Sequence, residues 1–188
     1  MSQEEQAGVG LFNVANWLTV GRIVLVPLVV VGLTAGGTTW RMVALAAFLV
    51  ASVTDFLDGR LARSRGLVTD FGKIADPVAD KALTGAALIC LSALGELPWW
   101  VTTVIMVREL GVTALRFWVI RRGVIAASRG GKLKTLLQII AICLYMIPWT
   151  PGLLRGLVMG AAVIATVVTG GDYLLRALRL RRAGPREA

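Results

Sequence analysis

The sequence contains no histidine among its 188 residues. That absence excludes histidine general bases, histidine zinc ligands and the Ser-His-Asp triad. Any proton abstraction must therefore fall to a carboxylate, a lysine or the substrate. Cysteine is nearly absent too, because Cys90 and Cys143 are the only two. Both lie inside apolar runs, so we expect buried thiols rather than a disulfide or a metal pair.

Charged residues are also scarce, at 16% of the chain, whereas 56% of the residues are hydrophobic and the mean hydropathy is +0.75. This composition is too apolar for a soluble domain and indicates a membrane protein. The net charge of +9 fits a surface that faces anionic lipid better than a nucleic-acid site, since no soluble domain is present to carry such a site.

Six apolar runs predict an all-α, polytopic membrane protein with six transmembrane helices. Each run is close to the roughly 20 residues that a bilayer crossing needs. A short amphipathic segment, 11–16, predicts an interfacial helix before the first span. The fifth span reaches full length only by including Lys134 and Gln138. We expect one membrane domain over residues 1–188, with a basic tail at 179–188. The expected spans are 17–34, 40–63, 71–94, 99–120, 133–147 and 153–178.

Basic residues gather at the second and fourth connections between spans and at the C-terminus. The opposite side carries only Arg41 and Arg155 as basic residues. The positive-inside rule then places both termini, and the residues of the second connection, on the cytoplasmic face of a multi-pass inner-membrane protein.

Four of the 11 acidic residues lie close together between two apolar runs: Asp55, Asp58, Asp76 and Asp80. On two helices, each pair occupies one face. A short connection makes the helices antiparallel, so the two pairs can converge. Clustered carboxylates resist burial without cations, and hard oxygen ligands suit Mg²⁺ or Mn²⁺. Two such ions would balance the four negative charges.

The stretch reads D-x2-D-G-x2-A-R-x8-G-x3-D-x3-D, which resembles the signature of the CDP-alcohol phosphatidyltransferase family. The resemblance implies that an acceptor hydroxyl attacks the β-phosphorus of CDP-diacylglycerol and that CMP leaves. It also implies that Asp55, Asp58 and Asp76 bind the metal ions, with Asp80 as a further ligand and the general base. An ion-pair network at the helix ends is the alternative interpretation.

The same resemblance implies the binding site for CDP-diacylglycerol. Gly59, Ala62 and Gly72 would leave room for the cytidine, although small residues in membrane helices also serve close packing. Arg63 would hold the diphosphate, although it could simply extend to the membrane interface. The family pattern implies the following contacts for CDP-diacylglycerol: Asp55, Asp58, Gly59, Ala62, Arg63 and Gly72.

Cations further along the chain predict a phosphorylated acceptor. Arg108 and Arg116 lie eight residues apart on one helix face, and Lys132, Lys134 and Thr135 open the fifth span. Positive-inside topology is an alternative reason for the lysines.

The runs DPVADK, REL and GKLKT look like the branch of the family that makes phosphatidylglycerophosphate from glycerol 3-phosphate. Transfer to inositol phosphate is the rival within the family, and a cation-coupled transporter is the rival outside it. Two overlapping G-x-x-x-G steps at Gly152, Gly156 and Gly160 could mark the face of a homodimer, which the family implies, or packing within one bundle. Membrane lipids are the other expected partners.

Overall fold

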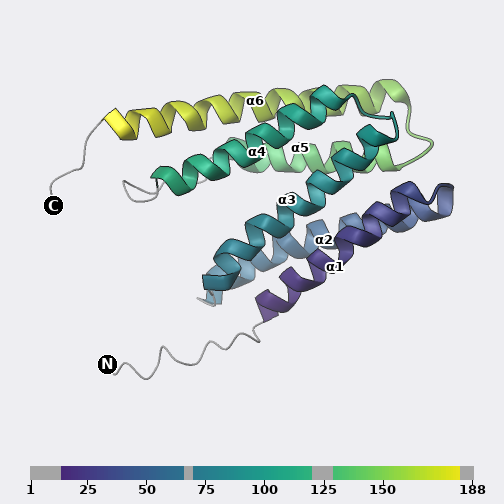
Figure 1. Cartoon of the computed structure of the whole chain (residues 1–188), viewed down its shortest axis with the longest axis horizontal. Coiled ribbons are helices and arrows are strands. Elements are labelled where there is room, and N and C mark those ends of the chain that lie inside the picture. The colour runs from purple at the N-terminus through teal and green to yellow at the C-terminus, as the bar shows by residue number, and fades with distance from the viewer. Residues whose placement is uncertain (1–13, 66–69, 120–128, 183–188) are drawn as a thin grey trace. The chain divides into compact units, whose positions relative to one another are not determined.

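The computed structural model describes residues 14–65, 70–119 and 129–182, with side chains for 20–54, 79, 81–115 and 130–179. In this part of the chain all regular structure is helical, which confirms the all-α prediction (Figure 1). The helices are α1 (Val14–Thr34), α2 (Thr38–Arg65), α3 (Asp70–Ala93), α4 (Trp99–Val119), α5 (Arg129–Met146) and α6 (Gly152–Arg182).

The helices form two compact units. The first contains α1, α2 and α3, together with Met146–Pro148, and the second contains α4, α5 as far as Tyr145, and α6. The prediction of one domain over the whole chain stays a prediction.

In the first unit, α1 packs against both α2 and α3. Its connection to α2 turns at Gly36 and Gly37, whose φ angles of 76° and 79° favour glycine. Gly32 lies where the two helices approach closely, because a Cβ added there would lie 2.8 Å from Ala44 Cβ and 2.8 Å from the Trp40 carbonyl oxygen. This hairpin fixes α1 antiparallel to α2.

In the second unit, α4 packs against α6, and the buried side chains include polar ones. Ile105 and Ala162 are fully buried apolar residues, as expected for a helix bundle. Lys134, Gln138 and Thr166 are buried as well. Buried polar groups in a helix bundle are costly unless they have partners or a function, so these three side chains are candidates for a functional role.

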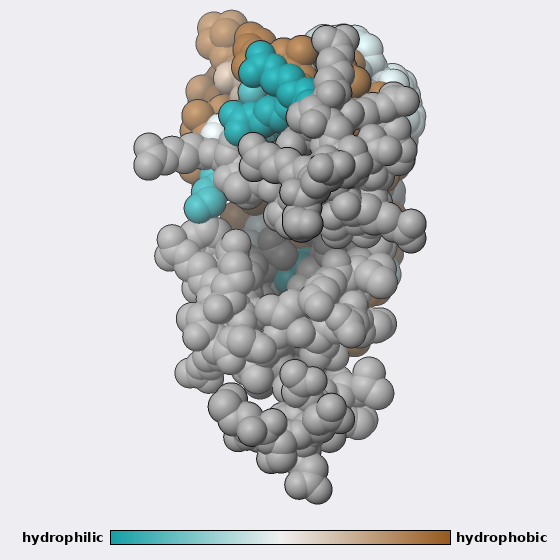
Figure 2. Space-filling view, turned by 90° about the vertical axis from the view of Figure 1, so that its left-hand side faces the viewer, coloured by the Kyte–Doolittle hydropathy of each residue, from teal (hydrophilic) through white to brown (hydrophobic). Residues whose placement is uncertain are grey.

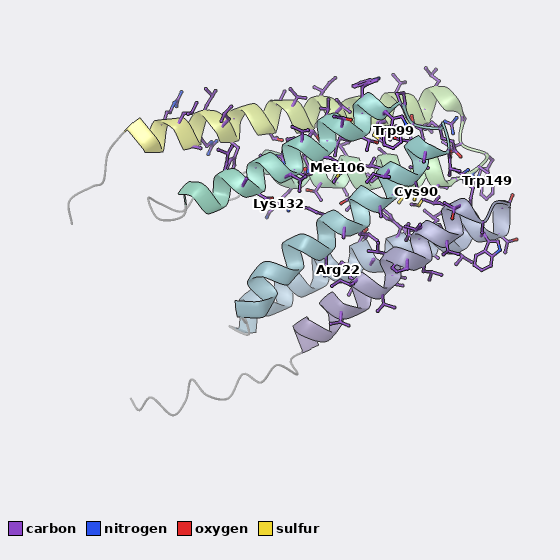
Figure 3. All side chains as sticks on the ribbon, viewed as in Figure 1. Arg22, Cys90, Trp99, Met106, Lys132 and Trp149 are labelled. Carbon is purple, nitrogen blue, oxygen red and sulfur yellow. The ribbon has the colours of Figure 1, made fainter. Side chains whose placement is uncertain are left out.

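Large apolar side chains are exposed along the helices, which is typical of surfaces in contact with lipid. Within the described residues, the segment Gly152–Arg179 is the one that is long and apolar enough to cross a membrane. The exposed tryptophans Trp99 and Trp149 lie at one end of the second unit, and Lys132 lies toward the other (Figure 3). Figure 2 views the end at which α6 finishes, where hydrophilic surface meets hydrophobic surface. Six membrane crossings remain a prediction.

The helix ends differ from the expected spans by a few residues. Residues 14–16 of the predicted interfacial helix form the first turn of α1, and residues 11–13 lie outside the described residues. α5 begins at Arg129, four residues before the predicted start, so two glycines lie in its first turn. α6 continues into the basic tail as far as Arg182, and residues 183–188 lie outside the described part.

Candidate active site

The four motif aspartates lie on the facing ends of two consecutive helices. Asp55 and Asp58 are near the end of α2, and Asp76 and Asp80 are near the start of α3. At 1.5 Å per residue, Asp58 and Asp76 lie about 10 Å and 9 Å from the ends joined by the connection, and Asp55 and Asp80 both lie about 15 Å from them. The aspartates therefore form two matched levels along the helices.

The connection between these helices is short. Arg65 ends α2 and Asp70 begins α3, and five residue steps can span at most about 18 Å. The two carboxylate-bearing helix ends are thus held together by the chain itself. The other residues expected to bind CDP-diacylglycerol lie on the same two helix ends: Gly59, Ala62 and Arg63 on α2, and Gly72 on α3. The side chains of all eight motif residues lie outside the described part.

A buried cation on α1 belongs to the same unit. Arg22 is 2% exposed, and it lies in the N-terminal half of α1 (Figure 3). Ten residues along each antiparallel helix from the contact of Gly32 with Ala44 lead to Arg22 and to Thr54, which precedes Asp55. A buried guanidinium stays charged and needs anionic compensation. The acidic residues of α1, α2 and α3 are the four motif aspartates and Asp70. Since Arg22 lies at the level of Thr54, α1 places a permanent positive charge beside the segment that carries these carboxylates.

The donor set suits a hard divalent cation. Every candidate ligand is a carboxylate oxygen, and the unit offers no histidine to recruit zinc or copper. Among the described side chains no group of three or more potential metal ligands occurs, and the four motif side chains are not among them. The ligand types and their two-level spacing therefore fit Mg²⁺ or Mn²⁺.

Two of the expected acceptor-binding cations meet at one carboxylate in the second unit. Arg108 Nη1 donates to Glu109 Oε1 at 3.1 Å, and Lys134 Nζ donates to the same oxygen. The side chains are 16%, 15% and 5% exposed for Arg108, Glu109 and Lys134. The structure thus joins α4 to α5 through a partly buried cluster of two cations and one anion.

The remaining acceptor candidates are placed differently. Lys132 and Thr135 are exposed on α5, and the Thr135 hydroxyl donates to the Gly131 carbonyl oxygen at 3.1 Å. Arg116 lies on α4, two turns beyond Arg108, and its side chain is outside the described part. The five candidates therefore divide into the partly buried pair Arg108 and Lys134, two exposed residues on α5, and Arg116.

Comparison with known proteins identifies the family of the chain. Residues 12–168 match the family model described as CDP-alcohol phosphatidyltransferase. The chain belongs to the CDP-alcohol phosphatidyltransferase family. The match covers the aspartate motif and all the candidate acceptor residues, so the resemblance seen in the sequence is confirmed at the level of the family.

Curated members of the CDP-alcohol phosphatidyltransferase family resemble the chain over most of its length. A probable phosphatidylglycerophosphate synthase of Mycobacterium tuberculosis is 54% identical over 172 residues, which cover 89% of this chain and 82% of that protein. A CDP-diacylglycerol–glycerol-3-phosphate 3-phosphatidyltransferase of Bacillus subtilis is 39% identical, with 87% and 94% covered. The enzyme of the same name from Rickettsia felis is 32% identical, with 86% and 93% covered.

Sequence reasoning missed two residues of this phosphatidyltransferase that lie against Arg108, one of the acceptor candidates. Arg108 Nη2 donates to Thr169 Oγ1 at 3.0 Å, and a Cβ added at Gly170 would lie 3.0 Å from Arg108 Cγ. The one available signal was a polar residue followed by two glycines inside the apolar run of α6. That signal does not say which cation the polar residue meets, because the pairing joins residues 61 positions apart.

Proposed function

We infer that this chain transfers the phosphatidyl group of CDP-diacylglycerol to glycerol 3-phosphate, giving phosphatidylglycerophosphate and CMP. The observation that carries the inference is the family match over residues 12–168, with every fixed position of the aspartate motif present. Relatives named for this reaction cover almost the whole chain at 32% to 54% identity. The transporter alternative has no such support.

The residues divide the work of the reaction among them. Asp55, Asp58 and Asp76, with Asp80, would hold two Mg²⁺ or Mn²⁺ ions. When bound, such ions neutralise the diphosphate and make CMP a better leaving group. Arg63 adds charge-assisted hydrogen bonds to the diphosphate.

Asp80 accepts the proton of the acceptor hydroxyl. A carboxylate with a pKa of about 4 is a weak base, so its contribution depends on alignment with that hydroxyl. Gly59, Ala62 and Gly72 offer the small side chains that a bound cytidine needs.

The acceptor phosphate is bound by the cations of the second unit, with Arg108 and Lys134 as the central pair. The cluster of Arg108, Lys134 and Glu109 carries a net charge of +1, so it attracts a phosphate dianion. Burial strengthens that attraction, because water screens it less. Lys132, Thr135 and Arg116 would extend the binding region.

We further propose a multi-pass inner-membrane protein with both termini and the active site on the cytoplasmic side. The support is the position of the exposed Trp99 and Trp149 at one end of the second unit and of Lys132 toward the other end.

A homodimer is also part of this proposal. A Cβ added at Gly152, Gly156 or Gly160 would meet nothing within 4 Å among the described residues, so this face is open for a second copy.

The deciding assay measures CMP release by the purified protein in detergent micelles with CDP-diacylglycerol and Mg²⁺. Separate reactions supply glycerol 3-phosphate, inositol phosphate, serine and no acceptor. We expect CMP with glycerol 3-phosphate. Release of CMP with inositol phosphate alone would transfer the assignment to the rival reaction, and no CMP with any acceptor would refute the transferase.

The Asp80→Asn variant tests the base. It removes the proton acceptor and keeps the side-chain volume, so turnover should fall by at least about a hundredfold. Binding of CDP-diacylglycerol, measured by calorimetry, should persist. If binding of the lipid is lost together with turnover, Asp80 is chiefly a ligand and the assigned base is wrong.

The Arg108→Ala variant tests the acceptor site. Loss of charge-assisted hydrogen bonds should raise the KM for glycerol 3-phosphate roughly ten- to a hundredfold and leave the KM for CDP-diacylglycerol nearly unchanged. Arg155→Ala is the matched control, since Arg155 lies in the same unit with its guanidinium 5.1 Å from the Tyr145 ring. Equal rises in both KM values would show that Arg108 does not bind the acceptor.

A further inference from the structure

Two consecutive residues of α6, Thr169 and Gly170, pack against the Arg108 side chain. The Thr169 hydroxyl accepts a hydrogen bond from Arg108 Nη2 at 3.0 Å. The same hydroxyl donates its own proton to the Ala165 carbonyl oxygen at 2.6 Å, one turn earlier in α6. Its proton is therefore committed to the helix backbone, and its lone pairs are left to face the guanidinium.

Gly170 leaves the space that the aliphatic part of the Arg108 side chain occupies. A Cβ built at this position would lie 3.0 Å from Arg108 Cγ, 3.5 Å from Nε and 3.8 Å from Cδ. The arginine stem thus lies directly against the backbone of α6, in the space that any larger residue would occupy. Arg108 Nε is buried there, with no hydrogen-bond partner among the described residues.

The opposite edge of the guanidinium is held by α4 itself. Arg108 Nη1 donates to Glu109 Oε1 at 3.1 Å. An arginine side chain has about 2 kcal/mol of rotamer entropy to lose when it is fixed. Contacts at both edges and along the stem remove that freedom before any phosphate arrives, and such preorganisation raises affinity.

We propose that Thr169 and Gly170 are positioning residues that fix Arg108 for the acceptor phosphate. This proposal rests on the acceptor role of Arg108 given above. It makes acceptor affinity depend on α6, a helix that contributes none of the residues expected from the sequence to bind the acceptor. Neither residue touches the reacting atoms, so their effect passes through the arginine.

The test compares two neighbouring glycines. Gly170→Ala and Gly171→Ala each add one methyl group to the same helix and gain the same helix propensity. A Cβ at Gly171 would meet nothing within 4 Å in the described structure, whereas one at Gly170 meets the arginine stem. We expect Gly170→Ala to raise the KM for glycerol 3-phosphate at least about fivefold, which corresponds to the low end of the usual cost of overpacking. Gly171→Ala should leave it unchanged, and both variants should keep the KM for CDP-diacylglycerol.

Two substitutions test the Thr169 hydroxyl, one that keeps the shape of the side chain and one that keeps the hydroxyl. Thr169→Val replaces it with a methyl group of similar size and should raise the KM for glycerol 3-phosphate about tenfold, as loss of a hydrogen bond to a charged group does. Thr169→Ser keeps the hydroxyl and should restore most of the affinity. A merely structural role for Thr169 would instead lower thermal stability and affect both substrates.

A second measurement follows the arginine directly. In protein labelled with ¹⁵N-arginine, the Nε–H signal that disappears in Arg108→Lys should exchange slowly with solvent in the unaltered protein and in Gly171→Ala. It should exchange faster in Gly170→Ala and Thr169→Val. If Arg108→Ala leaves the acceptor KM unchanged, the acceptor role itself fails. If Arg108→Ala raises the acceptor KM but Gly170→Ala and Thr169→Val do not, the proposed positioning role of Thr169 and Gly170 is refuted.

Discussion

Gly32 sets the distance between α1 and α2, and replacing it with alanine should separate them. An added Cβ would lie 2.8 Å from Ala44 Cβ, 2.8 Å from the Trp40 carbonyl oxygen and 3.1 Å from the Ala44 backbone nitrogen. Two of these three atoms belong to the backbone, which no side-chain rotation can move. The helices must therefore shift apart next to Val29 and Leu33, two buried residues of the same part of α1.

The expected change in the free energy of unfolding of Gly32→Ala follows from two opposing effects. Glycine to alanine in a helix interior gains about 1 kcal/mol where space is free, and overpacking costs about 1–3 kcal/mol. Gly21, on the same helix, has nothing within 4 Å of an added Cβ among the described residues, so Gly21→Ala shows the gain alone. We expect Gly32→Ala to be less stable than Gly21→Ala by about 1–3 kcal/mol, which is roughly 2–12 °C in Tm for a chain of this length.

The assay is thermal unfolding of both variants in the same detergent, followed by intrinsic fluorescence. Because α1 carries Arg22 beside the aspartate-bearing part of α2, Gly32→Ala should also lower turnover at temperatures where it remains folded. Equal melting temperatures for Gly32→Ala and Gly21→Ala would refute the close crossing, and with it the register that brings Arg22 to the level of Thr54.

Two further substitutions probe the second unit. Thr166 is fully buried and its hydroxyl has no hydrogen-bond partner among the described residues, so Thr166→Val should stabilise the protein by about 1 kcal/mol, measured as a higher Tm; an unchanged Tm with a raised acceptor KM would show instead that the hydroxyl serves the substrate. Glu96 Oε2 lies 3.8 Å from Arg155 Nη1 in a partly exposed pair, so Glu96→Gln should change stability by less than about 1 kcal/mol; a larger loss in chemical unfolding would mean that the pair is desolvated.

The helices could be predicted from the sequence because glycine and proline separate the apolar runs. Pro148 and Pro151 stop α5 before α6 begins, and the turn between α1 and α2 falls on a glycine pair with positive φ. The start of α5 was less predictable. Gly130 and Gly131 read locally as a loop, yet they lie in its first turn. Helix formation there depends on contacts that local propensity does not contain.

The placement of the motif aspartates on two consecutive helices was predictable because the information for it is local. Four carboxylates at helical spacing need only a helix and a short connection to form two levels, and both are present. The proposed acceptor site is different. Arg108 and Lys134 lie 26 positions apart in the sequence, and nothing in either helix alone says that one carboxylate holds both. Thr169 is more distant still.

Glu109 compensates the positive charges of Arg108 and Lys134, and the positions of the cations alone do not predict this role. Two positive side chains that are 16% and 5% exposed repel each other strongly when water is largely excluded, and fixing them together without an anion would be costly. Glu109 removes that cost in the absence of substrate and leaves the cluster one positive charge. If the cluster binds the acceptor phosphate as proposed, Glu109 is the carboxylate that keeps its two cations together between binding events, and an acidic residue beside an inward-facing arginine is the sequence feature to look for.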